Sequence, residues 1–173
     1  MEAVCHDGTC VRKSEDRKLL YRTFCFCQLI FSTIRHQNTS GTDGPASNNC
    51  LDMFREMFLT TSLAKLKEKD ASAVDANEVL KMATLGGARA MGLRNCDTLS
   101  RGKLADLIVI DLNQPNMQPI NNITKNLVYS GSKQNVVLTM VNGNILYEKG
   151  EFNIGEEPEK IYETANKMLA KIK

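Results

Sequence analysis

The chain has no cluster of basic residues interleaved with aromatic ones, and only 6% of its residues are aromatic. Its net charge of +2 is too small to indicate binding to nucleic acid or to an anionic membrane. Low-complexity tracts are absent as well. With 173 residues, 42% of them hydrophobic and 24% charged, the chain has the composition of a soluble globular protein with room for about one domain, or one domain and an arm.

Long hydrophobic runs are also missing. Leu19–Ile34 is the most apolar stretch, but it contains Arg22 and Gln28 and is shorter than the about 20 residues that a bilayer needs, so we expect a buried helix or strand there. Met1–Arg12 lacks the apolar region of a signal peptide. Six cysteines do not make a disulfide scaffold in a chain of this length, so we expect reduced thiols and a cytoplasmic location.

Met1–Ser40 differs in composition from everything that follows and shows no clear pattern. It holds both histidines, His6 and His36, and four of the six cysteines, which are Cys5, Cys10, Cys25 and Cys27. One hypothesis is a small zinc site built on Cys5, His6, Cys10, Cys25 and Cys27. The spacing supports it only in part, because paired zinc ligands usually follow a C-x(2–4)-C pattern. Cys5 and Cys10 have four residues between them and meet this pattern, whereas Cys25 and Cys27 have only one and do not.

The segment Gly41-Thr-Asp-Gly-Pro-Ala-Ser-Asn-Asn-Cys-Leu-Asp52 predicts a tight turn followed by a helix. We expect Asn49 to cap the helix while Asp52, three residues on, faces its positive end. Asp43 lies between two glycines of the turn. An exposed, rigid carboxylate there suits a metal ligand or a proton acceptor, and it equally suits an Asx-turn that only satisfies backbone N–H groups.

Hydrophobic periodicity and turn residues predict the remaining elements. Helices are expected over Leu51–Lys67, over Glu78–Thr84 with Asp75 as its cap and a break at Gly86-Gly87, and over Pro158–Lys173. A buried strand is expected over Asp106–Asp111, and further strands over Asn126–Tyr129, Asn135–Val141 and Ile145–Tyr147, with a hairpin turn at Asn142-Gly143. Such a small sheet would leave an open edge.

Four passages together resemble the C-terminal third of the metal-dependent amidohydrolases, most closely the branch that deaminates methylthioadenosine and S-adenosylhomocysteine, with chlorohydrolases and cytosine deaminases nearby. Gly41–Asp52 resembles the turn after the eighth barrel strand. Ala83-Thr-Leu-Gly-Gly-Ala-Arg-Ala-Met-Gly92 is similar to the T-x-x-x-A-x-x-x-G helix that follows. Leu99–Asp111 resembles the G-x-x-A-D-[LF] entry into an accessory β domain, and Val141–Tyr147 resembles its last hairpin.

The resemblance implies an α/β fold, namely the C-terminal fragment of a (β/α)₈ barrel with part of a small accessory β-sandwich and a C-terminal helix. The domains it implies are an atypical segment over residues 1–40, the end of the barrel over 41–95, the sandwich part over 96–155 and the helix over 156–173. It also implies hydrolysis of a non-peptide carbon–nitrogen bond, the metal-dependent deamination of an adenosine-type small molecule.

In this scheme Asp43 ligates a divalent metal, usually zinc, and accepts a proton from the attacking water. Ser47 and Asn48 lie near it and are candidates for substrate contact, although capping of the helix explains them equally well. The family's metal site also needs a His-x-His pair and two further histidines, and neither His6 nor His36 matches these motifs. We therefore expect this chain to bind no catalytic zinc and to be inactive alone, because such a zinc wants three or more protein ligands.

The likeness begins abruptly at Gly41, and we hypothesise that residues 1–40 are not native family sequence. Two alternatives to a deaminase fragment remain open. One is a non-catalytic module of helices and strands that associates with a partner chain, or with itself through an uncovered core. The other is a small zinc-binding protein built on the cysteines of residues 1–40.

Overall fold

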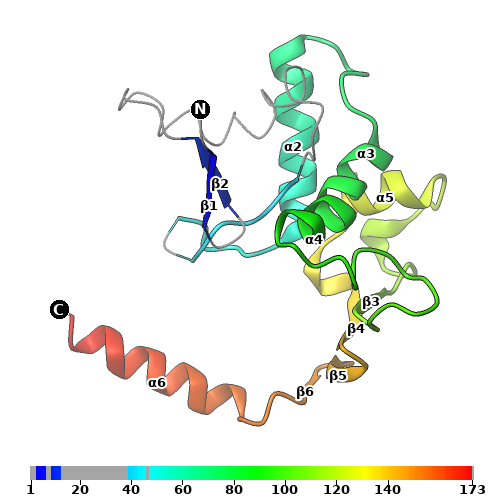
Figure 1. Cartoon of the computed structure of the whole chain (residues 1–173). Helices are drawn as coiled ribbons and strands as arrows, with labels where there is room; N and C mark the ends of the chain where they lie inside the picture. The colour runs from blue at the N-terminus through cyan, green and yellow to red at the C-terminus, as the bar shows by residue number, and fades with distance from the viewer. Residues whose placement is uncertain (1–2, 7–8, 13–38, 46, 173) are drawn as a thin grey trace. The chain divides into compact units, whose positions relative to one another are not determined.

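The structure is a computed structural model that describes residues 3–6, 9–12, 39–45 and 47–172. The chain divides into two compact units, the first comprising Met1–Thr98 with Leu112–Lys133 and the second comprising Leu99–Asp111 with Gln134–Lys173 (Figure 1). The helix or strand expected over Leu19–Ile34 lies outside the described residues. The predicted domain boundaries after residues 40, 95 and 155 remain predictions.

The chain begins with a pair of antiparallel strands, β1 over Ala3–His6 and β2 over Thr9–Arg12. The register places the backbone of Cys5 opposite that of Cys10. The sequence analysis found no clear pattern in this stretch and missed both strands. The two residues between these runs are Asp-Gly, a hairpin signal in the sequence that the sequence analysis overlooked.

Helix α2 spans Met53–Glu68, close to the predicted range. The predicted cap at Asn49 is wrong, because Asp52 has the extended backbone of an N-cap residue and its carboxylate accepts the N–H of Phe54 at 3.0 Å. Lys69 ends the helix in a left-handed conformation with φ of 54°. Phe54 and Met57 are almost fully buried, as expected for core residues.

A second helical segment begins with α3 over Ala76–Lys81, and the predicted cap Asp75 is confirmed. It continues through a π-helical turn, η2, over Met82–Gly86 and through α4 over Gly87–Ala90. The predicted break at Gly86-Gly87 is therefore wrong. Both glycines keep right-handed helical angles, with φ of −63° and −59°, so the helical path continues through them from the π-helical turn into α4. Gly92, with φ of 75°, follows its end.

The strand predicted over Asn126–Tyr129 is wrong, because these residues belong to helix α5, Ile123–Ser130. Asn122 caps α5 by accepting the N–H of Lys125 at 3.0 Å, a start signal that the strand prediction overlooked. The short 3₁₀ helix η3 over Pro115–Met117 precedes it. Figure 1 shows α2, α3 and α5 together in the first unit, and all three contribute to its core.

The second unit is built on a four-stranded antiparallel sheet in the order β3-β4-β5-β6. Its strands are Leu107–Ile110, Val136–Val141, Asn144–Glu148 and Glu151–Phe152, and the 3₁₀ helix η4, Lys133–Asn135, leads into β4. The predicted hairpin turn is confirmed by φ of 49° at Asn142 and 79° at Gly143. A second turn with positive φ at Lys149 and Gly150 leads into β6, which the sequence analysis missed.

The prediction that β3 is a buried strand is wrong. Ile108 and Val109 are 49% and 45% exposed, and because neighbouring side chains in a strand point to opposite faces, both faces of β3 are open. The last element is the predicted helix α6, which spans Pro158–Ala170 with proline in its first turn. Among the described residues, no helix is both long and apolar enough to cross a bilayer.

Candidate active-site turn

Asp43 lies at the centre of a tight turn and is exposed to solvent. Its φ of 58° is in the left-handed region, where aspartate is one of the few residues other than glycine that occur. Oδ1 accepts the N–H of Gly44 at 2.8 Å, and Oδ2 accepts the hydroxyl of Ser47 at 2.6 Å. These two bonds fix the plane of the carboxylate. The carboxylate is exposed, as the sequence predicted, and its bond to the N–H of Gly44 also fits the alternative in which Asp43 only satisfies backbone N–H groups.

The turn is fastened at both ends to the helices of the first unit. Before Asp43, the buried Ser40 donates its N–H to the carbonyl of Met82 at 3.2 Å. Met82 is the first residue of the π-helical turn. After it, Asn48 is 8% exposed and donates its side-chain N–H to Glu56 Oε1 of α2 at 2.7 Å. The carbonyl of Met82, in the π-helical turn, therefore holds the segment of the chain that leads to Asp43.

The two candidates for substrate contact are both engaged within the turn. Ser47 donates its hydroxyl to Asp43, and its N–H bonds the carbonyl of Gly44 at 3.1 Å. Asn48 uses both ends of its amide, since its Oδ1 accepts the N–H of Cys50 at 3.0 Å in addition to the bond to Glu56. Both residues thus help to hold the turn. Their contact with a substrate remains a prediction.

Asp52 is the second carboxylate of this segment, and its surroundings differ from those of Asp43. It is 8% exposed, caps α2 with Oδ1, and accepts the N–H of Lys133 with Oδ2 at 3.4 Å. Both oxygens are therefore used to join the start of α2 to the chain beyond α5. Nearby, contact with Cys50 raises the pKa of the Arg55 guanidinium above its ordinary value, so Arg55 is a permanent cation beside the turn.

The described residues do not fit a complete catalytic metal centre. Among them, no three side chains of histidine, cysteine, aspartate or glutamate are close enough to share one ion. A catalytic zinc ion usually has three protein ligands, and Asp43 would supply only one carboxylate. Of the ligands in the alternative N-terminal zinc site, Cys25 and Cys27 lie outside the described residues.

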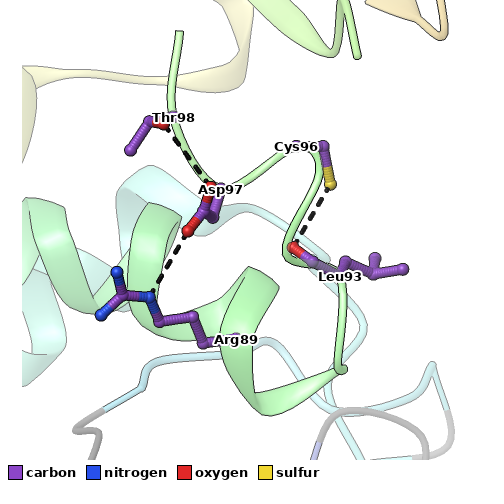
Figure 2. Close-up of polar contacts among 5 residues, drawn as sticks. All are labelled: Arg89, Leu93, Cys96, Asp97 and Thr98. Atoms are coloured by element: carbon purple, nitrogen blue, oxygen red, sulfur yellow. Dashed lines mark hydrogen bonds and ion pairs between the residues drawn. The ribbon is translucent and has the colours of Figure 1, made fainter. Parts of the chain in front are cut away.

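A second polar cluster fixes the loop that follows α4, and the sequence analysis did not identify it (Figure 2). The side chain of Asp97 is only 6% exposed and lies 3.4 Å from Nε of Arg89. Thr98 donates its hydroxyl to Oδ1 of the same carboxylate at 3.5 Å, and the thiol of Cys96 lies 3.9 Å from the carbonyl of Leu93. Arg89 and Asp97 are eight residues apart in the sequence and lie on either side of a loop. No periodic pattern in the sequence predicts such a pair, so only the structure reveals it.

The sequence profile of the amidohydrolase family matches residues 38–146, more than half of the chain. This chain belongs to the amidohydrolase family. It is 41% identical over 133 residues to a 5-methylthioadenosine/S-adenosylhomocysteine deaminase of Dictyoglomus thermophilum, covering 77% of this chain and 31% of the relative. A protein of the same name from Thermococcus onnurineus is 47% identical over 106 residues, which is 61% of this chain and 25% of the relative.

Among solved structures, the amidohydrolase chain is similar to an adenosine deaminase from Xanthomonas campestris with bound zinc. The TM-score is 0.72 and the identity 36%, over 76% of this chain and 30% of that one. It is also similar to an atrazine chlorohydrolase from Arthrobacter aurescens complexed with zinc, with a TM-score of 0.58 and 25% identity over 71% of this chain and 27% of the other.

These comparisons confirm the predicted resemblance to amidohydrolases of the deaminase and chlorohydrolase branches. They also confirm a mixed fold of helices and strands that matches part of the barrel-containing neighbours. The chain spans about a third or less of the length of these relatives, 31% of the first and 25% of the second. The activity of a whole deaminase is therefore a proposal for this chain, and so is the role of Asp43.

Proposed function

We propose that this chain carries one part of a metal-dependent aminohydrolase that removes an amino group from an adenosine-type purine nucleoside. Its relatives bear the name of methylthioadenosine and S-adenosylhomocysteine deaminases, which supports this substrate class. In this proposal the first unit provides the last turn of a (β/α)₈ barrel with its helices. The sheet of the second unit provides part of an accessory β-sandwich.

The observation that carries the proposal is the geometry of Asp43. Its carboxylate is exposed, held in one orientation by Gly44 and Ser47, and attached to two helices through Ser40 and Asn48. An ionised carboxylate is an acceptor for the proton of a water that attacks the carbon bearing the amino group. Because a proton acceptor must stay within hydrogen-bond reach of that water, a carboxylate fixed by two bonds is better suited than a freely rotating one.

Asp43 is also proposed as one ligand of the metal, since an oxygen of aspartate is an ordinary zinc ligand. When bound, such an ion acidifies a water molecule and makes it a nucleophile at neutral pH. The remaining ligands do not come from the described residues, and the whole sequence has only two histidines. We therefore propose that the chain alone binds no catalytic zinc and deaminates no substrate.

A hybrid protein tests the assignment of Asp43. In the Dictyoglomus thermophilum relative, the segment that aligns with this chain is replaced by the corresponding residues of this chain, and zinc content and ammonia release from methylthioadenosine are measured. We expect the hybrid to be active. The variant Asp43→Ala should lose its zinc and at least about a hundredfold in turnover, whereas Ser47→Ala should lose about tenfold because it only orients the carboxylate.

Asp70 provides the matched control for this experiment. Like Asp43 it is an exposed carboxylate in a turn that accepts hydrogen bonds from a serine, here Ser72. Asp70→Ala should leave zinc content and turnover unchanged. If an active hybrid keeps its zinc and its turnover in Asp43→Ala, the proposed role of Asp43 is wrong.

A second candidate function is a non-catalytic module that associates with another chain. The observation in its favour is the number of large apolar side chains that are exposed in the described residues, especially in β3 and α6. This candidate predicts that purified protein self-associates or requires a partner, and a stable, soluble monomer would count against it.

The third candidate, a zinc protein built on the N-terminal cysteines, remains a prediction because Cys25 and Cys27 lie outside the described residues. Metal analysis of the purified chain distinguishes it from the other two. Stoichiometric zinc that is lost on replacing Cys25 and Cys27 would support it. Zinc that is absent from the purified chain would contradict it.

A further inference from the structure

Helix α6 has an apolar stripe along its whole length. Its apolar residues recur at alternating spacings of three and four, which is the repeat of helices that pair with another helix. The stripe consists of Pro158, Ile161, Ala165 and Met168 in α6 and of Ile172 just beyond its end, with Tyr162 and Leu169 beside it. The other sides of the helix carry lysines and glutamates together with Thr164, Asn166 and Ala170.

The stripe is uncovered in the second unit. Ile161 is 43% exposed, Met168 60% and Leu169 59%, and none of the residues of α6 is buried. A helix of 13 residues is marginal in water by itself and gains most of its stability by burying an apolar face. Ala165 lies at the middle of the stripe and leaves a shallow groove between Ile161 and Met168 that would accept a side chain of a second helix.

The charges of this segment are divided between its two ends. Residues 156–163 contain four glutamates and one lysine, whereas residues 164–173 contain three lysines and no acidic residue. Some of these charges pair within the segment, Glu156 with Lys160 and Glu163 with Lys167. Glu157 and Lys171 make no ion pair within the described part of the chain, although they lie at opposite ends of α6 and on the same side of the stripe.

We propose that α6 pairs with α6 of a second copy of this chain in an antiparallel arrangement. A two-fold axis near Thr164 then places Glu157 of each copy beside Lys171 of the other, so the acidic end of one helix meets the basic end of its partner. The opposed helix dipoles add to this preference. A parallel pair would bring like charges together at both ends, which is unfavourable.

Sedimentation equilibrium of the full chain tests whether the stripe is the interface. Ala165→Glu places a charge in the centre of the stripe, and we expect it to raise the dimer dissociation constant at least about tenfold. Ala170→Glu makes the same change on the opposite side of the helix and should leave the constant unchanged. Circular dichroism of both variants shows whether the helix is kept, so a loss of pairing is separated from a loss of folding.

Charge reversal tests the antiparallel arrangement. Glu157→Lys alone and Lys171→Glu alone should each raise the dissociation constant about threefold or more, because each change produces two like-charge contacts in a two-fold pair. The double variant, Glu157→Lys with Lys171→Glu, should restore the original value.

Three outcomes would overturn the proposal. The first is a monomer at every concentration, which is what α6 docked on its own chain would produce. The second is association that Ala165→Glu leaves intact, which would assign self-association to another surface such as the open edge of the sheet. The third is a double variant that pairs no better than the single ones. None of these results bears on Asp43, which the hybrid deaminase tests separately.

Discussion

Both units of this chain contain regular structure, but their cores are very different. All of the buried apolar side chains among the described residues belong to the first unit, and they are Phe54, Met57, Ala64, Val74, Ala76, Val79, Met82, Ala88, Met117 and Val128. In the second unit Asn135 is the one buried residue that the described part of the chain contains. Most of the apolar residues of strand β4 are half-buried, so the sheet there buries its apolar surface only in part.

The difference between the two cores shows that local turn residues and the burial of apolar side chains contribute separately to the structure. The hairpins of the second unit follow from local turn residues, whose positive φ angles specify where the chain reverses. The helices of the first unit additionally bury apolar side chains against one another. Removing apolar surface from water in this way is the main favourable contribution to the free energy of folding. We infer that the first unit is rigid enough to hold Asp43, and that the second unit depends on further contacts such as the proposed pairing of α6.

The largest expected effect comes from opening a cavity in the first unit. Met117 is fully buried, so Met117→Ala should lower the free energy of unfolding by about 2–5 kcal/mol. Ile108→Ala in β3 removes a side chain that is 49% exposed and should cost about 1 kcal/mol or less. Urea unfolding followed by circular dichroism measures both, and equal losses would contradict the contrast between the units.

Glycine is needed for different reasons in the two units. A Cβ at Gly131 would lie 2.4 Å from the carbonyl of Leu127 and 2.6 Å from Cδ1 of Phe54, so Gly131→Ala should cost about 1–3 kcal/mol through overpacking. Gly143 has open space around it but a φ of 79°, so Gly143→Ala should cost about 1 kcal/mol through backbone strain alone.

Substitution by asparagine, which tolerates the left-handed conformation, distinguishes a position that needs glycine for its φ angle from one that needs it for lack of space. Gly143→Asn should be milder than Gly143→Ala, whereas Gly131→Asn should be at least as harmful as Gly131→Ala. The same urea unfolding measurement decides this, and a milder effect of asparagine at Gly131 would show that space is not the limiting factor there.

A smaller effect is expected at the contact between α2 and α5. Lys65 donates from Nζ to the hydroxyl of Tyr129 at 2.8 Å, and the ammonium lies 4.4 Å from the centre of the same ring. Tyr129→Phe removes the hydroxyl and keeps the ring, so it should lower the free energy of unfolding by about 0.5–1.5 kcal/mol. Tyr162→Phe in α6 is the matched change at a side chain that is 59% exposed and should have no measurable effect on unfolding.

The smallest effect depends on pH. The N–H of Asn77 donates to Asp75 at 2.8 Å and lowers the pKa of that carboxyl below its ordinary value of 3.8. Because the pKa is lower in the folded state, the cap stabilises α3 fully above about pH 3.8 and loses this contribution as the pH falls through the folded value. Asp75→Asn keeps an acceptor oxygen but does not titrate.

Thermal unfolding between about pH 5 and about pH 3 checks this prediction. The drop in melting temperature on acidification should be smaller in Asp75→Asn than in the parent chain. An identical drop in the two proteins would show that the ionised cap adds nothing to the stability of α3.

The fold could be predicted from the sequence where local chemistry decides it. Asp75 as a cap, the Asn142-Gly143 hairpin and Pro158 at the start of α6 each have a backbone preference of their own, and each is confirmed. Residues 126–129 were assigned wrongly, because a short apolar run fits a strand as well as a helix and the helix cap at Asn122 was overlooked. The buried position of Val128 between helices, which favours the helix, is a tertiary fact.

The candidate site was predictable only in part. The two glycines around Asp43 indicated the turn and the exposed carboxylate, and the structure contains both. The cap was misplaced by three residues because several side chains in Ser47–Asp52 have the same capping chemistry. Asp52 is the cap because its carboxylate reaches the N–H groups of both Phe54 and Lys133, and no sequence pattern records those distances.

Ammonia release from methylthioadenosine by the purified chain, with zinc supplied, tests most directly the claim that this chain holds one part of an aminohydrolase site and lacks the rest of the metal centre. We predict no release above the rate without protein, because Asp43 alone cannot hold a catalytic ion. A rate of ammonia release that rises in proportion to the concentration of the chain and is abolished in Asp43→Ala would contradict the claim. Such a result would show that this chain assembles a working metal centre by itself.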